Sequence, residues 1–394
     1  MGEGARTKNR AHLMIPYATQ TIEEVDVAAV RSVLTSGWLT QGPAVPRFEK
    51  AFAAVHQVQF ACAVTNATAG LHLACLALDI GPGDWVWTSP NSFVASANCA
   101  LYCGARVDFV DIDLVTRNMC SLTLAEKLVQ AKKMGLLPKV VIPVHFAGLP
   151  CDMEALRTLA DKYGFALVGD ASHAVGSSYM GKPVASDWAD ISVFSFHPVK
   201  IITTGEGGMV VTNKPHLAKR LQLLRSHGIT RDKDLMETVP EGPWVYEQQA
   251  LGFNYRMTDM QAALGNSQLD RLSAFHEQRE SIAARYPQML VDLGLKLPVV
   301  PDGYRSSWHL YVVEVAADRA RILTALREQD IWLNVHYIPI YLQPYHRRLG
   351  GFKPGYCPNA ETYYQGALSL PIYPTLTLEQ QQFTADALRS AIAA

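Results

Sequence analysis

Short apolar and β-branched runs alternate with helical patterns through the first two thirds of the chain. The runs that we interpret as strands are "FACAV", residues 85–88, "RVDFVDI", "KVVIPVHF", "ALVGDAS", "ISVFSF" and "GGMVVTN". Most of them are separated by segments with apolar residues at helical spacing, which is typical of a largely parallel sheet with helices packed on it. The pattern therefore predicts an α/β fold built on one large, mixed or mostly parallel sheet that ends near residue 265.

Helix boundaries are marked by turn residues. The segment "TIEEVDVAAVRSVLTSG" has apolar residues at helical spacing, and we expect its helix to end at Gly37. Two further helices follow strands directly: one begins near Thr68, and one begins at about Phe93 after a turn at residues 89–92. In open parallel sheets, ligands bind beyond the carboxyl ends of the strands, so these strand-to-helix turns are the places to look for chemistry.

The last third of the chain has a different organisation. From about residue 266 it is helical, then alternates through "SSWHLYVVEV", a helix near 318–328 and "IWLNVHYIPI", and it closes with a helix. This order predicts a small α+β domain. We therefore expect a mobile tail at 1–14, a large domain at 15–265 and a small C-terminal domain at 266–394.

Charge and cysteine content exclude several classes of partner. Thirty-five basic and 36 acidic side chains leave a formal net charge of -1, so neither nucleic acid nor an anionic membrane is favoured as a partner. The N-terminal segment lacks the apolar core of a signal peptide, and no stretch approaches the length of a membrane span. Seven cysteines form no CxxC pair and no metal spacing. We expect a cytoplasmic protein with reduced thiols and no metal site.

The turn "TNATAG" is a candidate phosphate site. It places Ala67 and Thr68 at a helix N-terminus, where free N–H groups and the helix dipole bind anions. Taken alone this is weak evidence, because a threonine at a helix start is usually only a cap. The two common nucleotide motifs, GxGxxG after a strand and GxxxxGK[ST], are missing, which disfavours a hydride-transfer enzyme or an ATPase.

Two ionisable residues lie at similar positions. Asp170 ends the strand-like "ALVGD", and Lys200 follows thirty residues later within "FSFHPVKIITTGEGG", five residues after Ser195. Lysine is seldom buried without a partner or a purpose. Asp170 as a turn cap and Lys200 as a surface loop residue are the simpler interpretations. Together with a phosphate site, however, a lysine for a Schiff base and a carboxylate for a ring nitrogen meet the needs of pyridoxal 5′-phosphate (PLP).

Five segments carry a family resemblance. "TNATAGLHLA", "DASHAVGSSY", "SVFSFHPVKIITTGEGGMVVTN", "LGFNYRMTDMQAALG" and "HYIPIYLQPY" resemble the DegT/DnrJ/EryC1/StrS family of sugar aminotransferases, from about residue 15 to the end of the chain. The resemblance implies the fold-type I architecture of PLP-dependent transferases. The last of these segments, with "SFHPVK" and "ITTGEGG", looks most like enzymes that aminate C4 of a UDP-4-keto-6-deoxy-N-acetylhexosamine, as in the pseudaminic acid pathway.

The resemblance also implies roles for residues that match the family motifs. Lys200 is expected to bind the cofactor covalently and to move the proton, with a pKa lowered by burial. Asp170 is expected to hydrogen-bond the ring nitrogen, and His173 to lie near the ring hydroxyl. The expected cofactor-binding set is Ala67, Thr68, Phe93, Asp170, His173, Ser195, Lys200 and Asn254, the last reaching across from a neighbouring subunit. Expected substrate contacts are Arg256, His336 and Tyr337.

The family resemblance sets the expected reaction. Members with histidine in place of the lysine are dehydratases, whereas Lys200 implies a true aminotransferase. We expect L-glutamate as amino donor, a nucleotide-linked keto-sugar as acceptor, and a homodimer with shared active sites. Alternatives are 3- or 4-amination of a dTDP- or GDP-linked keto-sugar, an amino-acid aminotransferase, a cysteine desulfurase-like lyase, and a non-catalytic PLP-binding regulator.

Overall fold

A computed structural model describes residues 14–316 and 318–394. The expected tail at 1–14 therefore lies outside the described residues except for Met14, which is exposed. In the part of the chain that the structure describes, no helix is long and apolar enough to cross a bilayer.

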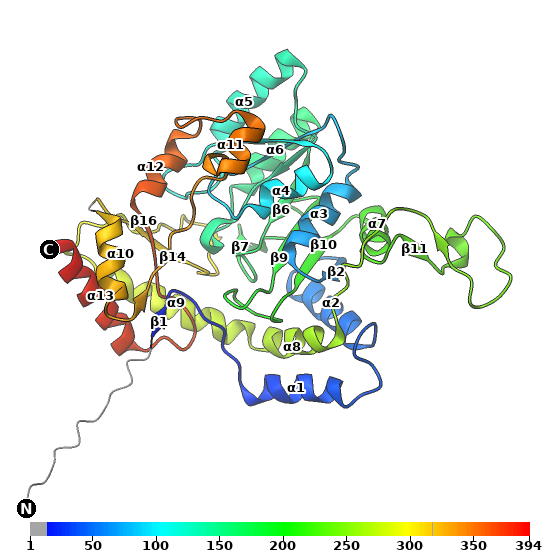
Figure 1. Cartoon of the computed structure of the whole chain (residues 1–394), viewed down its shortest axis with the longest axis horizontal. Helices are drawn as coiled ribbons and strands as arrows, with labels where there is room; N and C mark the ends of the chain where they lie inside the picture. The colour runs from blue at the N-terminus through cyan, green and yellow to red at the C-terminus, as the bar shows by residue number, and fades with distance from the viewer. Residues whose placement is uncertain (1–13, 317) are drawn as a thin grey trace, which may run out of the picture.

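A seven-stranded sheet forms the centre of the molecule (Figure 1). Its strand order is β2, β10, β9, β6, β5, β3 and β4, and only β10 runs antiparallel to its neighbours. The predicted mostly parallel α/β sheet is confirmed. The strands are β2 (Phe60–Val64), β3 (Trp85–Thr88), β4 (Arg106–Phe109), β5 (Val140–Ile142), β6 (Ala166–Asp170), β9 (Ile191–Ser195) and β10 (Gly208–Thr212).

Helices cover both faces of this sheet. Because successive side chains of a strand point to opposite faces, Val193 packs into the core under one helical layer and Phe194 into the core under the other. The first layer contains α3 (Ala67–Ala77), α4 (Ala95–Tyr102) and α7 (Pro215–Arg225). The second contains α2 (Ala44–Val55), α5 (Ser121–Met134), α6 (Met153–Tyr163) and α8 (Asp259–Asp270). The result is a three-layer body.

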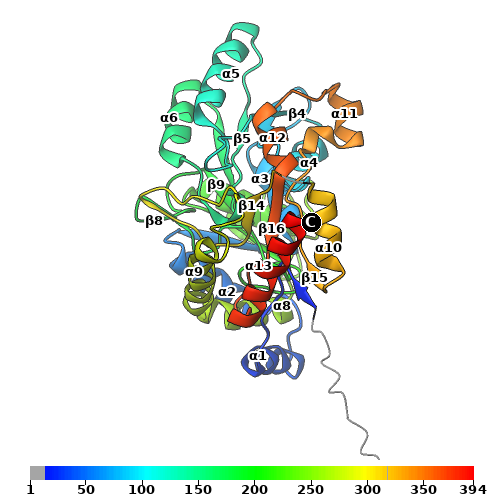
Figure 2. The ribbon, with the colours of Figure 1, turned by 90° about the vertical axis from the view of Figure 1, so that its left-hand side faces the viewer.

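The C-terminal region has its own core of buried apolar side chains. Strands β14 (Tyr311–Glu314) and β16 (Ala367–Leu370) pair antiparallel, and β1 (Ile15–Pro16) pairs in parallel with β15 (Ile331–Trp332). Figure 2 shows α9 (Leu272–Met289), α10 (Arg319–Arg327) and α13 (Leu378–Ala393) around them. Helices α11 (Pro344–Gly350) and α12 (Pro358–Gly366) lie nearer the large sheet. Helix α8 runs through the expected boundary at 265, and the division into two domains stays a prediction.

Two smaller features complete the fold. Helix α1 (Glu24–Leu34) lies beneath α8, and a hairpin formed by β11 (Ile229–Thr230) and β12 (Glu247–Gln248) projects from the body beyond α7 (Figure 1). The short strands β7 (Ser178–Tyr179), β8 (Lys182–Pro183) and β13 (Tyr304–Arg305) form a separate three-stranded sheet.

Three predicted helix ends are corrected by the structure. Helix α1 stops at Leu34, capped by Thr35, instead of reaching Gly37. Helix α4 begins at Ala95, two residues after Phe93. The cap of α3 is Asn66, whose side chain accepts a hydrogen bond from the Ala69 N–H at 2.8 Å. Asn66 is a better cap than Thr68 because its side chain reaches the free amide from outside the helix, which leaves Ala67 and Thr68 as the first two helical residues.

Candidate active site

A cavity of about 720 Å³ opens at the carboxyl ends of the parallel strands, where α/β sheets bind ligands. Segments far apart in sequence meet there: the α3 N-terminus, the α4 N-terminus, the ends of β6 and β9, and residues 334–338. Nine of the sequence-predicted site residues line it, namely Ala67, Thr68, Phe93, Asp170, His173, Ser195, Lys200, His336 and Tyr337. The fold therefore brings together most of the set that the sequence singled out.

Lys200 lies in the connection between β9 and β10. Both strands are hydrogen-bonded into the sheet and to each other, so the two ends of this connection are fixed. Loss of solvation on burial lowers the pKa of the Lys200 ammonium from 10.5 to about 8, although the Asp170 carboxylate favours the charged form. A neutral amine, which is what nucleophilic attack and proton transfer need, is thus accessible close to neutral pH.

The Asp170 carboxylate is held by two hydroxyl groups. Asp170 ends β6 and is 4% exposed. Its Oδ2 accepts a hydrogen bond from Ser96 Oγ at 2.6 Å, and its Oδ1 accepts one from Ser172 Oγ at 2.6 Å. Ser92 Oγ lies 2.7 Å from Ser96 Oγ, which extends the network by one member. Short bonds to both oxygens fix the orientation of the carboxylate.

His173 is a neutral imidazole of defined orientation. Burial lowers its pKa well below the usual range, and the neighbouring Lys200 charge acts in the same direction. Nδ1 accepts a hydrogen bond from the Ala147 N–H at 3.3 Å, so the proton resides on Nε2, which donates to the Tyr337 hydroxyl oxygen at 3.2 Å. The ring of His309 packs against His173 with centroids 4.3 Å apart. The single N–H of His173 is therefore directed at Tyr337, which also lines the cavity.

The N-terminus of α3 fits a phosphate group. Among the described residues no acceptor is bound to the N–H groups of Ala67 and Thr68, because the Asn66 cap takes up the Ala69 N–H instead. Gly208 completes this arrangement: a Cβ there would lie 2.8 Å from the Ala67 nitrogen, so strand β10 can approach the helix end only as glycine. Two free donors at the positive end of a helix, with Ser195 beside them in the cavity, are the donor set that phosphates bind.

The remaining walls are aromatic and imidazole rings. Phe93 is 60% exposed in spite of its apolar ring, so it leaves an apolar surface free at the cavity. His336 is buried, its pKa is lowered to about 3 by loss of solvation, and its Nδ1 lies 2.7 Å from Ser369 Oγ. Tyr17 packs against it with ring centroids 5.1 Å apart. These rings line a site for a flat, partly apolar ligand.

Two predicted residues do not line the cavity of their own chain. Asn254 is exposed and bridges to Ser226, and Arg256 is half-buried and bridges to Val64. Since Asn254 is expected to act from a neighbouring subunit, its exposure leaves that expectation open. Sequence reasoning also missed lining residues, chiefly Tyr17, Ser92, Ser96, Ser172, Glu206 and Asn334. Ser172 could have been found from its position two residues after Asp170.

The donor set fits PLP. Free helix N–H groups suit its phosphate, the held carboxylate suits its ring nitrogen, and a lysine with lowered pKa suits its aldehyde. On the seven-stranded sheet, these groups define a fold-type I PLP-dependent enzyme.

Comparison with known proteins identifies the family. Residues 20–389 match the model of the DegT/DnrJ/EryC1/StrS aminotransferase family, and the chain belongs to it. The chain is similar to the spore coat polysaccharide biosynthesis protein SpsC of Bacillus subtilis (strain 168), with 38% identity over 392 residues and 98% of each chain covered.

Two solved structures are close. Helicobacter pylori PseC, an aminotransferase involved in the biosynthesis of pseudoaminic acid, superposes with a TM-score of 0.88 at 32% identity, covering 97% of this chain and 100% of that one. The PLP form of the putative sugar aminotransferase Spr1654 from Streptococcus pneumoniae gives 0.87 at 28%, covering 97% and 99%. This protein is therefore a PLP-dependent sugar aminotransferase, and the predicted family, enzyme class and cofactor are confirmed.

Proposed function

We propose that the enzyme transfers the amino group of L-glutamate to C4 of a UDP-linked 4-keto-6-deoxy-N-acetylhexosamine. The observation that carries this proposal is the similarity to PseC over nearly the whole of both chains, together with the cluster of Lys200, Asp170 and His173 in one cavity. Amination of a dTDP- or GDP-linked keto-sugar, at C3 or C4, uses the same residues and is an outcome of the test below.

Each residue of the cluster has a defined task in amino transfer. When bound, PLP supplies an aldehyde and an electron-withdrawing ring, which allow an amino group to pass between carbon atoms. Lys200 Nζ would hold the cofactor and, as a neutral amine, would carry a proton between carbon atoms. Asp170 would keep the ring nitrogen protonated through a carboxylate that Ser96 and Ser172 orient. The α3 N–H groups and Ser195 would bind the phosphate.

In this proposal, residues 334–338 form the substrate side. His336 and Tyr337 belong to this segment, which lines the cavity together with the α3 and α4 N-termini. His336 stays neutral near pH 7 because of its low pKa, so it offers the sugar a hydrogen bond without a charge. Arg256 does not line the cavity of its own chain. In this proposal it therefore binds a carboxylate or diphosphate only at a site that a second subunit completes.

A homodimer completes this proposal. The projecting β11–β12 hairpin and the segment after it expose large apolar side chains, with Val239 90%, Trp244 69% and Leu251 81% exposed (Figure 1). Apolar surface of this extent on a projecting arm supports burial against another copy of the chain. Asn254 lies on the same connection and is exposed, which supports its reaching the phosphate site of the partner.

The seven free thiols support a cytoplasmic location.

The first experiment tests the cofactor linkage. The protein loaded with PLP should show a visible absorption band that is absent from Lys200→Ala and retained in Lys219→Ala, an exposed lysine outside the cavity. L-glutamate should bleach the band. A band of equal intensity in Lys200→Ala would remove Lys200 from the proposed role.

The second experiment tests the substrate. Keto-sugars linked to UDP, dTDP or GDP are added to the glutamate-treated enzyme, and recovery of the band is followed while the product is examined by NMR. The proposal expects recovery with the UDP-4-keto sugar and a new nitrogen at C4. Recovery with only a dTDP- or GDP-linked sugar, or a nitrogen at C3, refutes the substrate assignment and leaves the aminotransferase chemistry intact.

A further inference from the structure

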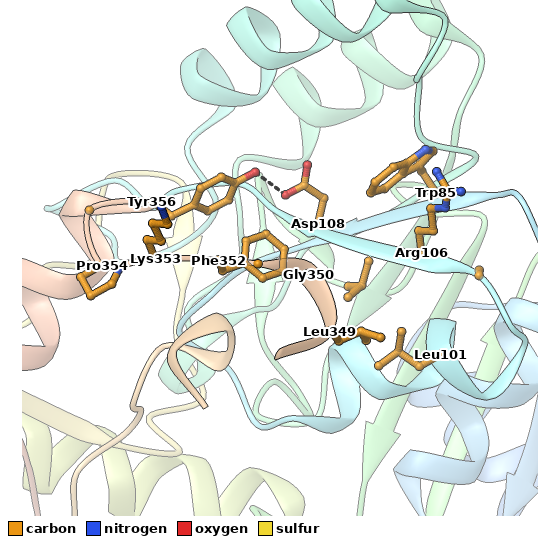
Figure 3. Close-up of a pocket in the computed structure, with 14 residues that line it drawn as sticks. Trp85, Leu101, Arg106, Asp108, Leu349, Gly350, Phe352, Lys353, Pro354 and Tyr356 are labelled. Atoms are coloured by element: carbon orange, nitrogen blue, oxygen red, sulfur yellow. Dashed lines mark hydrogen bonds between the residues drawn. The ribbon is translucent and has the colours of Figure 1, made fainter. Parts of the chain in front are cut away.

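A second cavity, which we call the edge cavity, lies at the free edge of the central sheet. It is about 840 Å³ in volume and is lined by the edge strand β4, the C-terminal end of α4, and residues 349–356, which comprise the end of α11 and the loop after it (Figure 3). It shares no lining residue with the active-site cavity. Its volume lies within the range of roughly 300–1,000 Å³ that is usual for small-molecule sites.

The unpaired charge that faces the edge cavity is positive. Asp108 is already satisfied, because it pairs with Lys127 at 2.8 Å and accepts a hydrogen bond from the Tyr356 hydroxyl at 2.6 Å. Arg106 and Lys353 also line the cavity, and within the described part of the chain neither has an ion-pair partner. The guanidinium N–H groups and the ammonium group are therefore available to an anion.

Aromatic rings form much of the cavity wall. The Arg106 guanidinium lies over the Trp85 ring, 5.4 Å from its centroid, and these two side chains form one end of the site (Figure 3). Phe352 and Tyr356 form the other end, with centroids 5.0 Å apart. Flat ligands pack well on such surfaces, and an arginine plane stacks on them too.

The loop that closes the cavity has a fixed shape. Gly351 and Gly355 adopt left-handed backbone conformations with φ of +65° and +88°, which favour glycine. The Gly355 N–H donates to Glu361 Oε1 at 2.7 Å, and the Tyr341 hydroxyl donates to the same oxygen. Because this anchoring needs no ligand, the cavity is preformed, and little binding energy is spent on ordering it.

We propose that the edge cavity binds a nucleoside phosphate, whose phosphate binds Arg106 beside Trp85 and whose base packs on Phe352 and Tyr356, next to Lys353. An aliphatic acid would leave the aromatic wall uncovered, and an uncharged ring would leave Arg106 unpaired. A ligand that joins a flat ring to a phosphate satisfies both. This inference concerns no residue of the active-site cavity and does not depend on the proposed sugar substrate.

Titration calorimetry on the PLP-loaded full-length protein tests the proposal, with uridine 5′-monophosphate (UMP) as probe. Arg106→Gln with Lys353→Gln removes the two cations. The matched control, Lys133→Gln with Arg321→Gln, removes the same charge from exposed positions outside both cavities. UMP should bind wild type and the control variant with equal affinity. In the edge variant, which carries Arg106→Gln and Lys353→Gln, UMP binding should be absent or at least tenfold weaker. Uridine and inorganic phosphate should each bind at least tenfold more weakly than UMP.

The opposite results overturn the proposal. Unchanged UMP binding in the edge variant would mean that the nucleotide binds elsewhere, including the active-site cavity. An equal loss in the control would mean unspecific attraction by charge, and phosphate binding as tightly as UMP would mean an anion site without base recognition. Absence of UMP binding to wild type refutes it directly. Arg106→Gln alone, at an exposed position, repeats the test if the double variant folds poorly.

Discussion

Replacing Lys200 by methionine should stabilise the cofactor-free protein at neutral pH. The pKa of Lys200 falls from 10.5 to about 8 on folding because the ammonium group loses solvation. The folded protein therefore holds this proton less tightly than the unfolded chain does, and keeping it bound costs stability. Methionine has a similar length and no charge, so the variant avoids that cost.

The size of the effect follows from the pKa difference. A drop from 10.5 to about 8 corresponds to a penalty of about 3 kcal/mol at pH 7, where both states carry the proton. The penalty is fully present below pH 8 and disappears as the pH passes 10.5. At pH 9.5 the folded protein has released the proton, and about 1 kcal/mol should remain.

Urea unfolding of cofactor-free wild type and Lys200→Met at pH 7 and 9.5 measures this difference. The stability advantage of the variant should shrink by about 2 kcal/mol between the two pH values. Better packing by methionine adds a term that does not depend on pH, so the change with pH isolates the charge. Lys219→Met, at an exposed position, should show no such change. An advantage that stays constant across this pH range would refute the lowered pKa.

Three further predictions concern neighbouring features. Ser96→Ala removes the 2.6 Å hydrogen bond to Asp170 and should weaken PLP binding about tenfold, measured by titration of the visible band; unchanged affinity would show that Ser172 alone orients the carboxylate. Gly208→Ala places a Cβ 2.8 Å from the Ala67 nitrogen and should destabilise the protein by about 1–3 kcal/mol, so thermal unfolding at the wild-type temperature would contradict that close approach. Burial lowers the pKa of His145 to about 3, so the folded protein binds fewer protons than the unfolded chain below pH 6.5, and wild type should lose about 2–3 kcal/mol by pH 4.5. In acid unfolding, His145→Gln should lack that part of the loss, and an equally steep loss in the variant would exclude His145 as its source.

Local patterns were sufficient to predict the central sheet. Each predicted run from "FACAV" to "GGMVVTN" became a strand of it, because these runs are buried on both faces and carry a strong apolar signal. The same logic located the site: Ala67, Asp170 and Ser195 all lie at the same edge of the sheet, where the strands end.

Pairings between distant segments could not be predicted. Strands β1 and β15 have two residues each, too few to show any periodicity, yet they join the start of the described chain to the C-terminal region. The antiparallel position of β10 between β2 and β9 is a property of the whole sheet. In the sequence, Ser96 is one more small residue in a predicted helix. Only the fold brings Asp170, 74 positions later, within 2.6 Å of its hydroxyl.

Residues of helix α4 line both cavities. Ser96 in its first turn lines the active-site cavity, and Leu101 near its last residue lines the edge cavity. Eight residues span about 12 Å and move as a stiff unit. One short helix therefore carries both a wall residue of the edge cavity, Leu101, and the hydroxyl that holds the Asp170 carboxylate, Ser96 Oγ.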